Sequence, residues 1–136
     1  MRTGTTWIIS LLLIASCSNK DKEASASNWI SLRADSINTV TLGDTLVIYE
    51  SICRGCAYEG STRFDIQDSL GIIKLVDIIS TDNNSSDMAG GSISQDILLK
   101  PVRTGTTTIK LYKILSPDTA KEDSAQFRTY TITIKN

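Results

Sequence analysis

The feature that most constrains the fold is the run of residues 128–135, in which two kinds of side chain alternate strictly. Arg128, Tyr130, Ile132 and Ile134 alternate with three threonines and Lys135. Successive side chains of a β-strand point to opposite faces, so this pattern is typical of a strand with one apolar face. Such a face must be covered by a second layer of structure. The chain is therefore expected to build its core from sheets.

Shorter β-rich runs recur along the chain and are separated by turn residues. They are residues 40–42, 45–50, 64–66, 72–79, 93–99 and 106–114. The apolar spacing of residues 72–79 also fits a short helix, but their β-branched side chains and the preceding Gly71 favour a strand. With residues 128–135, the sequence predicts about seven short strands and no helix, which is typical of an immunoglobulin-like antiparallel β-sandwich. The cysteines and tryptophan that pin antibody domains are missing, so the core is expected to consist mainly of Ile, Leu and Val.

The composition excludes several classes of function. The chain has no histidine, which rules out histidine-based catalytic triads, His–Cys dyads and histidine-containing metal sites within it. Its 14 Lys and Arg nearly balance 15 Asp and Glu, so no electrostatic argument favours nucleic-acid binding. Asp65, Asp68, Asp77 and Asp87 are scattered, with no spacing that predicts an acid–base pair. We therefore expect no enzyme activity, no cofactor and no bound metal.

The first residues are expected to direct export rather than to fold. A basic start, a short apolar run and small residues at its end are typical of a secretory signal, and the run is too short to span a membrane. Residues 14–17, Ile-Ala-Ser-Cys, resemble the lipobox of bacterial lipoproteins. That resemblance implies a signal peptide of residues 1–16, cleavage before Cys17 and lipid attached to Cys17. The alternative is an ordinary signal with an incidental cysteine.

The segment after Cys17 is expected to be a tether. Residues 17–28 are polar, charged and small, so they cannot bury enough surface to fold. The folded domain is then residues 29–136, and only the lipid anchor is expected to contact the membrane. The resemblance to lipoproteins implies a location in the bacterial cell envelope, at the outer membrane, on either its periplasmic face or the cell surface. No sequence feature points to an oligomeric state.

Cys53 and Cys56 form the one unusual motif inside the domain. Two cysteines three residues apart fit the ends of a β-turn, where the Cα separation suits a disulfide, and Gly55 allows the positive φ of a type II turn. The expected compartment is oxidising, so the sequence favours a local disulfide. A thioredoxin-like redox site, a zinc site and two free thiols are the alternatives, although no helix-forming segment follows and no second ligand pair exists.

Two other segments fall between predicted strands. Residues 88–92 contain Gly90 and Gly91, which let the backbone bend sharply or approach a partner closely. Residues 114–116 open a polar connection before the last strand. Each segment alone is also consistent with an ordinary surface loop.

Five short segments, residues 43–48, 55–58, 88–92, 104–111 and 130–134, are spread over residues 42–136, nearly the whole domain. They resemble strands and loops of the chagasin-like cysteine-protease inhibitors, an immunoglobulin-like family. Two inhibitory motifs of that family, Asn-Pro-Thr-Thr and Arg-Pro-Trp, are replaced here by residues 52–54 and 114–116. The scaffold therefore matches the family better than the inhibitory contacts do.

The resemblance implies that the partner is a cysteine protease and that three loops bind it from one end of the sandwich. Arg54 and Tyr58 are of residue types enriched in binding hot spots. The implied loop residues are Cys53, Arg54, Gly55, Cys56, Ala57, Tyr58, Ala89, Gly90, Gly91, Ile114, Leu115 and Ser116. The alternatives are a non-inhibitory surface lipoprotein with an adhesive or structural role and, less favoured, thiol–disulfide exchange through the cysteine pair.

Overall fold

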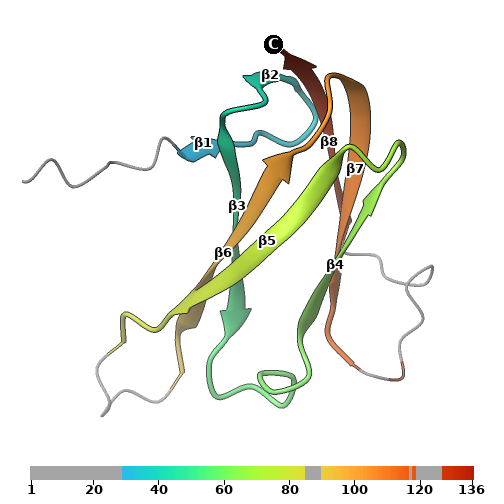
Figure 1. The fold of residues 1–136 in the computed structure, drawn as a ribbon. Coiled ribbons are helices and arrows are strands. Elements are labelled where there is room, and N and C mark those ends of the chain that lie inside the picture. The colour runs from blue at the N-terminus through green and yellow to red at the C-terminus, as the bar shows by residue number, and fades with distance from the viewer. Residues whose placement is uncertain (1–28, 85–89, 117, 119–126) are drawn as a thin grey trace, which may run out of the picture.

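The computed structural model describes residues 29–84, 90–116, 118 and 127–136, and these residues form two packed β-sheets (Figure 1). One sheet has the strand order β1-β3-β6-β5 and the other the order β2-β8-β7-β4. The strands are β1 (Trp29–Ser31), β2 (Ile37–Thr41), β3 (Thr45–Cys53), β4 (Arg63–Asp68), β5 (Ile73–Thr81), β6 (Ser92–Pro101), β7 (Gly105–Ile114) and β8 (Phe127–Lys135). The prediction of an all-β, immunoglobulin-like sandwich is confirmed.

The first two strands depart from the predicted antiparallel pattern. β1 pairs with β3 and β2 pairs with β8 in parallel, whereas the other pairings are antiparallel. Residues 32–36 cross from one sheet to the other, with the N–H of Leu32 bonded to the Val47 carbonyl and the N–H of Asp35 to the Thr129 carbonyl. The three-residue β1 is the strand that the sequence did not predict.

The core lies between the sheets and is mainly aliphatic, as predicted. The alternation in β8 buries Tyr130, Ile132 and Ile134 against the inner face of the other sheet. Burying one such side chain contributes about 1.5–3 kcal/mol relative to leaving it exposed. The most deeply buried residues around them are Leu46, Ile48, Ile72, Ile97, Leu99, Ile109 and Leu111.

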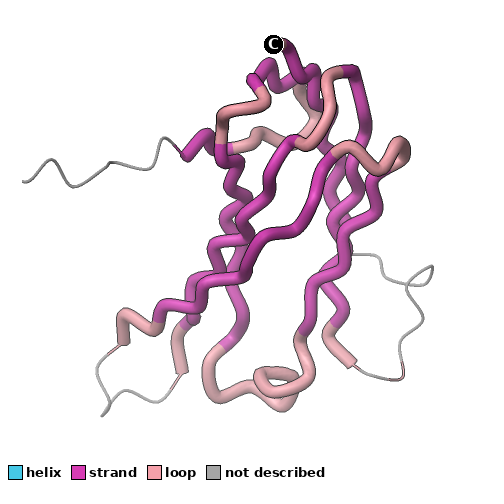
Figure 2. Tube along the Cα trace, in the orientation of Figure 1, coloured by secondary structure: helices cyan, strands magenta, loops and turns pink. Residues whose placement is uncertain are grey.

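Three strand connections meet at one end of the sandwich. β3, β5 and β7 end there, while β4, β6 and β8 begin there, at the lower edge of Figures 1 and 2. The pairing register agrees, because Cys53 lies opposite Ser92 and Arg63 opposite Ile114. This end contains the loops that the sequence singled out, and we call them the first loop (residues 54–62), the second loop (82–91) and the third loop (115–126), of which 85–89, 117 and 119–126 lie outside the described residues.

The N-terminal predictions are not tested by the fold. The predicted signal peptide, Cys17 and the tether lie outside the described residues. Within the described part of the chain, no helix is long and apolar enough to cross a membrane.

Candidate functional site

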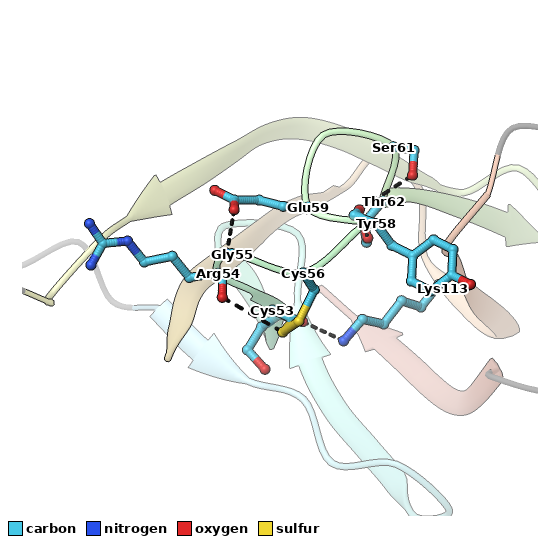
Figure 3. Close-up of a disulfide and its surroundings, with 10 residues drawn as sticks. Cys53, Arg54, Gly55, Cys56, Tyr58, Glu59, Ser61, Thr62 and Lys113 are labelled. Atoms are coloured by element: carbon cyan, nitrogen blue, oxygen red, sulfur yellow. Dashed lines mark hydrogen bonds between the residues drawn. A yellow bond between two sulfur atoms is a disulfide. The ribbon is translucent and has the colours of Figure 1, made fainter. Parts of the chain in front are cut away.

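The first loop begins with the predicted disulfide. Cys53, the last residue of β3, is bonded to Cys56, and their Cα atoms are 5.7 Å apart. Gly55 has a φ of 74°, in the left-handed region that favours glycine. Its N–H donates a 2.6 Å hydrogen bond to the Glu59 carboxylate, which closes the turn from the other side (Figure 3). The first loop is therefore held by a covalent and a polar link within a few residues.

The rest of the first loop consists of turns that bond to one another. The Glu59 N–H donates to the Cys56 carbonyl at 3.1 Å, and the Thr62 N–H and hydroxyl both donate to the Tyr58 carbonyl, at 2.9 and 2.7 Å. No helix follows the cysteine pair in residues 54–62, and β4 begins at Arg63. A thioredoxin-like site requires such a helix, so the local structure favours a stabilising disulfide over an exchange site.

Arg54 and Gly55 connect the first loop to the second. The Arg54 N–H donates to the Gly91 carbonyl at 3.0 Å, and its guanidinium Nε lies 3.2 Å from the Asp82 carboxylate. A Cβ on Gly55 would lie 3.6 Å from the Gly90 backbone nitrogen, so the two backbones are in close approach. Gly90 and Gly91 thus lie beside the disulfide turn, whereas Ala89 lies outside the described residues.

Asp82 and Asn84, which the sequence analysis did not single out, organise the second loop. The backbone N–H and side-chain amide of Asn84 donate to Asp82, and the amide also donates to the Ser92 carbonyl at 2.8 Å. These hydrogen bonds from Asn84, followed by the positive charge of Arg54, lower the pKa of the Asp82 carboxyl below its usual value. Their role could have been predicted from the Asp-Asn-Asn run at residues 82–84, because such runs are typical of turns closed by side-chain hydrogen bonds.

The third loop is joined to the first by a side-chain bond. The Ser61 hydroxyl donates to the Leu115 carbonyl at 2.6 Å, and the Arg63 guanidinium to the Ser116 carbonyl at 3.4 Å. Leu115 and Ser116 are partly exposed, whereas Ile114 ends β7 and is only 3% exposed. The Ile114 side chain packs inside the sandwich, so Leu115 and Ser116 are the accessible residues among the three predicted here.

Tyr58 is the large side chain that the first loop exposes. It is 51% exposed, and Figure 3 shows it extending from the disulfide turn in the opposite direction from Arg54. Cys53, Gly55, Cys56 and Ala57 are exposed around it. Arg54, in contrast, is paired with Asp82 and its side chain is 21% exposed, so it links two loops rather than extending into solvent.

A charged layer that the sequence did not predict lies directly beneath the loops. The Glu50 carboxylate lies 3.2 Å from the Arg128 guanidinium and 3.9 Å from the Lys113 ammonium, which also donates to the Ser51 carbonyl. The sequence does hold a sign of this layer, because Glu50 lies on the same face of its strand as the apolar Leu46 and Ile48.

Among the described residues, no group of three or more Cys, Asp or Glu side chains could hold a metal ion.

The fold is shared with two solved structures. The crystal structure of the cysteine protease inhibitor EhICP2 from Entamoeba histolytica is 21% identical, with a TM-score of 0.61, and the match covers 79% of this chain and 96% of that one. The solution structure of amebosin is 16% identical, with a TM-score of 0.52, and the match covers 78% of this chain and 95% of that one. No protein-family model and no curated protein matches the sequence. At this level of identity, the chain is similar to these proteins in fold.

Proposed function

We propose that the domain inhibits papain-like cysteine proteases by placing its three loops in the active-site cleft. The observation that carries this proposal is the position of the loops. Segments singled out from the sequence come together at one end of a sandwich whose fold is shared with a cysteine protease inhibitor.

The bonds between the loops support the proposal physically. Binding orders loops and side chains, and a surface that is already ordered avoids much of that cost. Here the disulfide and Glu59 hold the first loop, Arg54 joins it to the second loop, and Ser61 joins it to the third. The described residues of the three loops would therefore need little further ordering to enter a cleft.

The residues take different roles within these loops. Tyr58 is the proposed anchor, because a large exposed aromatic side chain supplies contact area at low entropic cost. Gly90 would let the backbone of the second loop lie against the enzyme, and Leu115 and Ser116 would contribute from the third loop. Arg54 stabilises the loops through Asp82.

An inhibition assay tests the proposal directly. Residues 29–136 contain all the strands β1 to β8, and this domain should inhibit at least one enzyme in a panel of papain-like proteases. Replacing Tyr58 with Ala should raise the inhibition constant about 30-fold, the effect of a hot-spot loss of about 2 kcal/mol. Tyr49→Ala is the matched control, because Tyr49 is similarly exposed, at 55%, but lies within β3 away from the loops.

Two results would reject the proposal. A panel without any inhibited enzyme would favour the non-inhibitory adhesive or structural role. Equal effects of the two tyrosine substitutions would show that the loop end is not the binding surface.

The disulfide gives a second test of the same proposal. Replacing Cys53 and Cys56 together with Ser should weaken inhibition, because the first loop must then be ordered on binding. The free energy of unfolding should fall by less than ~3 kcal/mol, since the closed loop is short. If the disulfide instead served thiol–disulfide exchange, the wild-type domain would oxidise a model dithiol, with an added oxidant to restore its own disulfide, at a catalytic rate. The double variant would not.

A further inference from the structure

Glu50 lies on the inner face of β3, where the neighbouring side chains are apolar. In β3, Leu46, Ile48 and Glu50 all face the other sheet, and the first two are fully buried. The Glu50 side chain is only 8% exposed. A carboxylate removed from water in this way is costly unless partners compensate for the loss of hydration.

The partners of Glu50 come from the opposite sheet. Arg128 of β8 lies 3.2 Å from one carboxylate oxygen, and Lys113 of β7 lies 3.9 Å from the other. Lys113 also donates to the carbonyl of Ser51, the residue after Glu50. This charged layer therefore ties β3 to β7 and β8 across the interior of the sandwich.

The layer lies immediately below the first and third loops. Glu50 precedes the disulfide residue Cys53 by three positions in the same strand, and Lys113 precedes Leu115 by two. Arg128 is the second residue of β8, the strand that follows the third loop. The strands linked by Glu50 are thus the ones that carry these two loops.

Apolar packing is incomplete at this level. A hollow of about 300 Å³ lies beside the ion pairs, lined by Glu50, Leu111, Lys113, Phe127 and Arg128. Unfilled space leaves neighbouring side chains without contacts that would resist a small shift. The charged layer is therefore one of the contacts that hold the two sheets together under the loops.

We propose that Glu50 is a positioning residue that sets the first and third loops relative to each other. Buried ion pairs are weak contributors to net stability, and their best-supported use is to select one arrangement among several. The inference rests on the proposed function, in that loops set at the correct spacing fit a protease cleft without rearrangement.

Glu50→Gln is the test, and Asp68→Asn is its matched control. Asp68 is a second partly buried carboxylate in the sandwich, bonded by Thr107 and by the N–H groups of Leu70 and Ile73, but it lies at the opposite end from the loops. Both variants replace a carboxylate with an amide of the same shape. Glu50→Gln should raise the inhibition constant about tenfold, equivalent to ~1.4 kcal/mol, whereas Asp68→Asn should leave it unchanged.

A measurement without protease separates this inference from the proposed function. Backbone amide chemical shifts of the Glu50→Gln domain should change throughout residues 54–62 and at Leu115 and Ser116, whereas those of Asp68→Asn should change near residues 69–73. If the wild-type domain inhibits no protease, these shifts still decide the role of Glu50. Shift changes confined to the direct neighbours of Glu50, or equal losses of inhibition in both variants, would overturn it.

Arg128→Gln keeps the test usable if Glu50→Gln does not fold. The Arg128 side chain is 59% exposed, so its replacement disturbs the core little while removing the shorter ion pair. It should change the same loop amides as Glu50→Gln. Unchanged loop amides in Arg128→Gln would contradict the inference.

Discussion

At the scale of single residues, Gly91 has a backbone conformation and surroundings that favour glycine. Its φ is 104°, and a Cβ there would lie 2.8 Å from the side-chain oxygen of Asn84. That side chain bonds to both Asp82 and Ser92. A larger residue would therefore strain the backbone and displace the side chain that organises the loop.

Gly91→Ala is expected to destabilise the domain by about 1–3 kcal/mol, the usual cost of a residue held in a sparsely populated conformation. Thermal and denaturant unfolding measure this change. Gly60→Ala is the control, because Gly60 lies in the first loop with no atom within 4 Å of the position of its Cβ. Equal losses in the two variants would show that the strain at Gly91 has no special effect.

Tyr130 is expected to make the fold less stable at alkaline pH. Its side chain is 2% exposed, and burial raises the pKa of its phenol above the ordinary value of 10.0, although Arg128 partly offsets this shift. A group whose pKa is higher in the folded state stabilises the fold below its unfolded pKa, and this contribution is lost as the pH rises through the folded pKa. The fold is therefore expected to lose this contribution to its stability above pH 10.0.

Tyr130→Phe keeps the ring and removes the titrating hydroxyl. The free energy of unfolding of the wild type should fall more steeply above pH 10.0 than that of the variant. Urea unfolding at a series of pH values measures both slopes. Parallel curves for the two proteins would mean that Tyr130 does not control the alkaline limit.

At the scale of elements, the outer edge of β5 is the place where the sheet is most open to unwanted pairing. β5 lies at the edge of its sheet, and Leu75, Val76 and Ile79 are exposed. Open, apolar edge strands are templates for aggregation, and proteins interrupt them with bulges and charges. β5 has both devices, a register shift between Leu75 and Asp77 and an Asp77 carboxylate that accepts the N–H of Ile78 at 2.8 Å.

Asp77→Ala should therefore increase aggregation without altering the fold. Light scattering at increasing protein concentration should detect it, while the free energy of unfolding changes by no more than about 0.5 kcal/mol, as for most surface substitutions. Asp96→Ala removes the same charge from β6, a central strand of the same sheet, and should not aggregate. Equal aggregation of both variants would assign the effect to net charge rather than to the edge.

The strands were predictable to the extent that their side chains alternate. Residues 72–79 were correctly predicted as a strand, observed as Ile73–Thr81, because β-branched residues outweighed the helix-like spacing. β1 could not be predicted, because its three residues, Trp29–Ser31, are too few to show a period. The parallel pairings of β1 and β2 depend on the crossing of residues 32–36 between sheets, which local sequence does not encode.

At the scale of the whole molecule, the sequence shows the motifs of the candidate site but not the contacts between them. The disulfide and the paired glycines follow from local turn chemistry, so both were visible as motifs. The links that make one surface of the three loops join residues distant in sequence, such as Arg54 with Asp82, Ser61 with Leu115 and Glu50 with Arg128. Which side chains meet across the sandwich depends on the register of both sheets, and only the fold reveals it.

The described chain begins at the end of the sandwich opposite the loops, and the predicted membrane anchor at Cys17 precedes that point in the sequence. Trp29 pairs with Thr45 at the start of β3, and the disulfide lies at the other end of that strand. β3 has nine residues, so the strand separates these points by roughly 25 Å. A tether that enters at Trp29 would thus leave the loops at the far end, directed away from the membrane.

Cys17→Ser tests the anchor that this arrangement assumes. A protein with two or more acyl chains stays bound to membranes, and replacing Cys17 removes the thiol that would carry the lipid. In a bacterial host, the wild type should therefore sediment with the outer membrane, and Cys17→Ser should not. Mass spectrometry of the wild type should also detect acyl chains on residue 17. The double Ser variant of Cys53 and Cys56 is the control, and it should stay with the membrane, because those cysteines pair with each other. If Cys17→Ser still sedimented with the membrane, another segment would have to bind the lipid, and the proposed orientation of the loops would no longer follow.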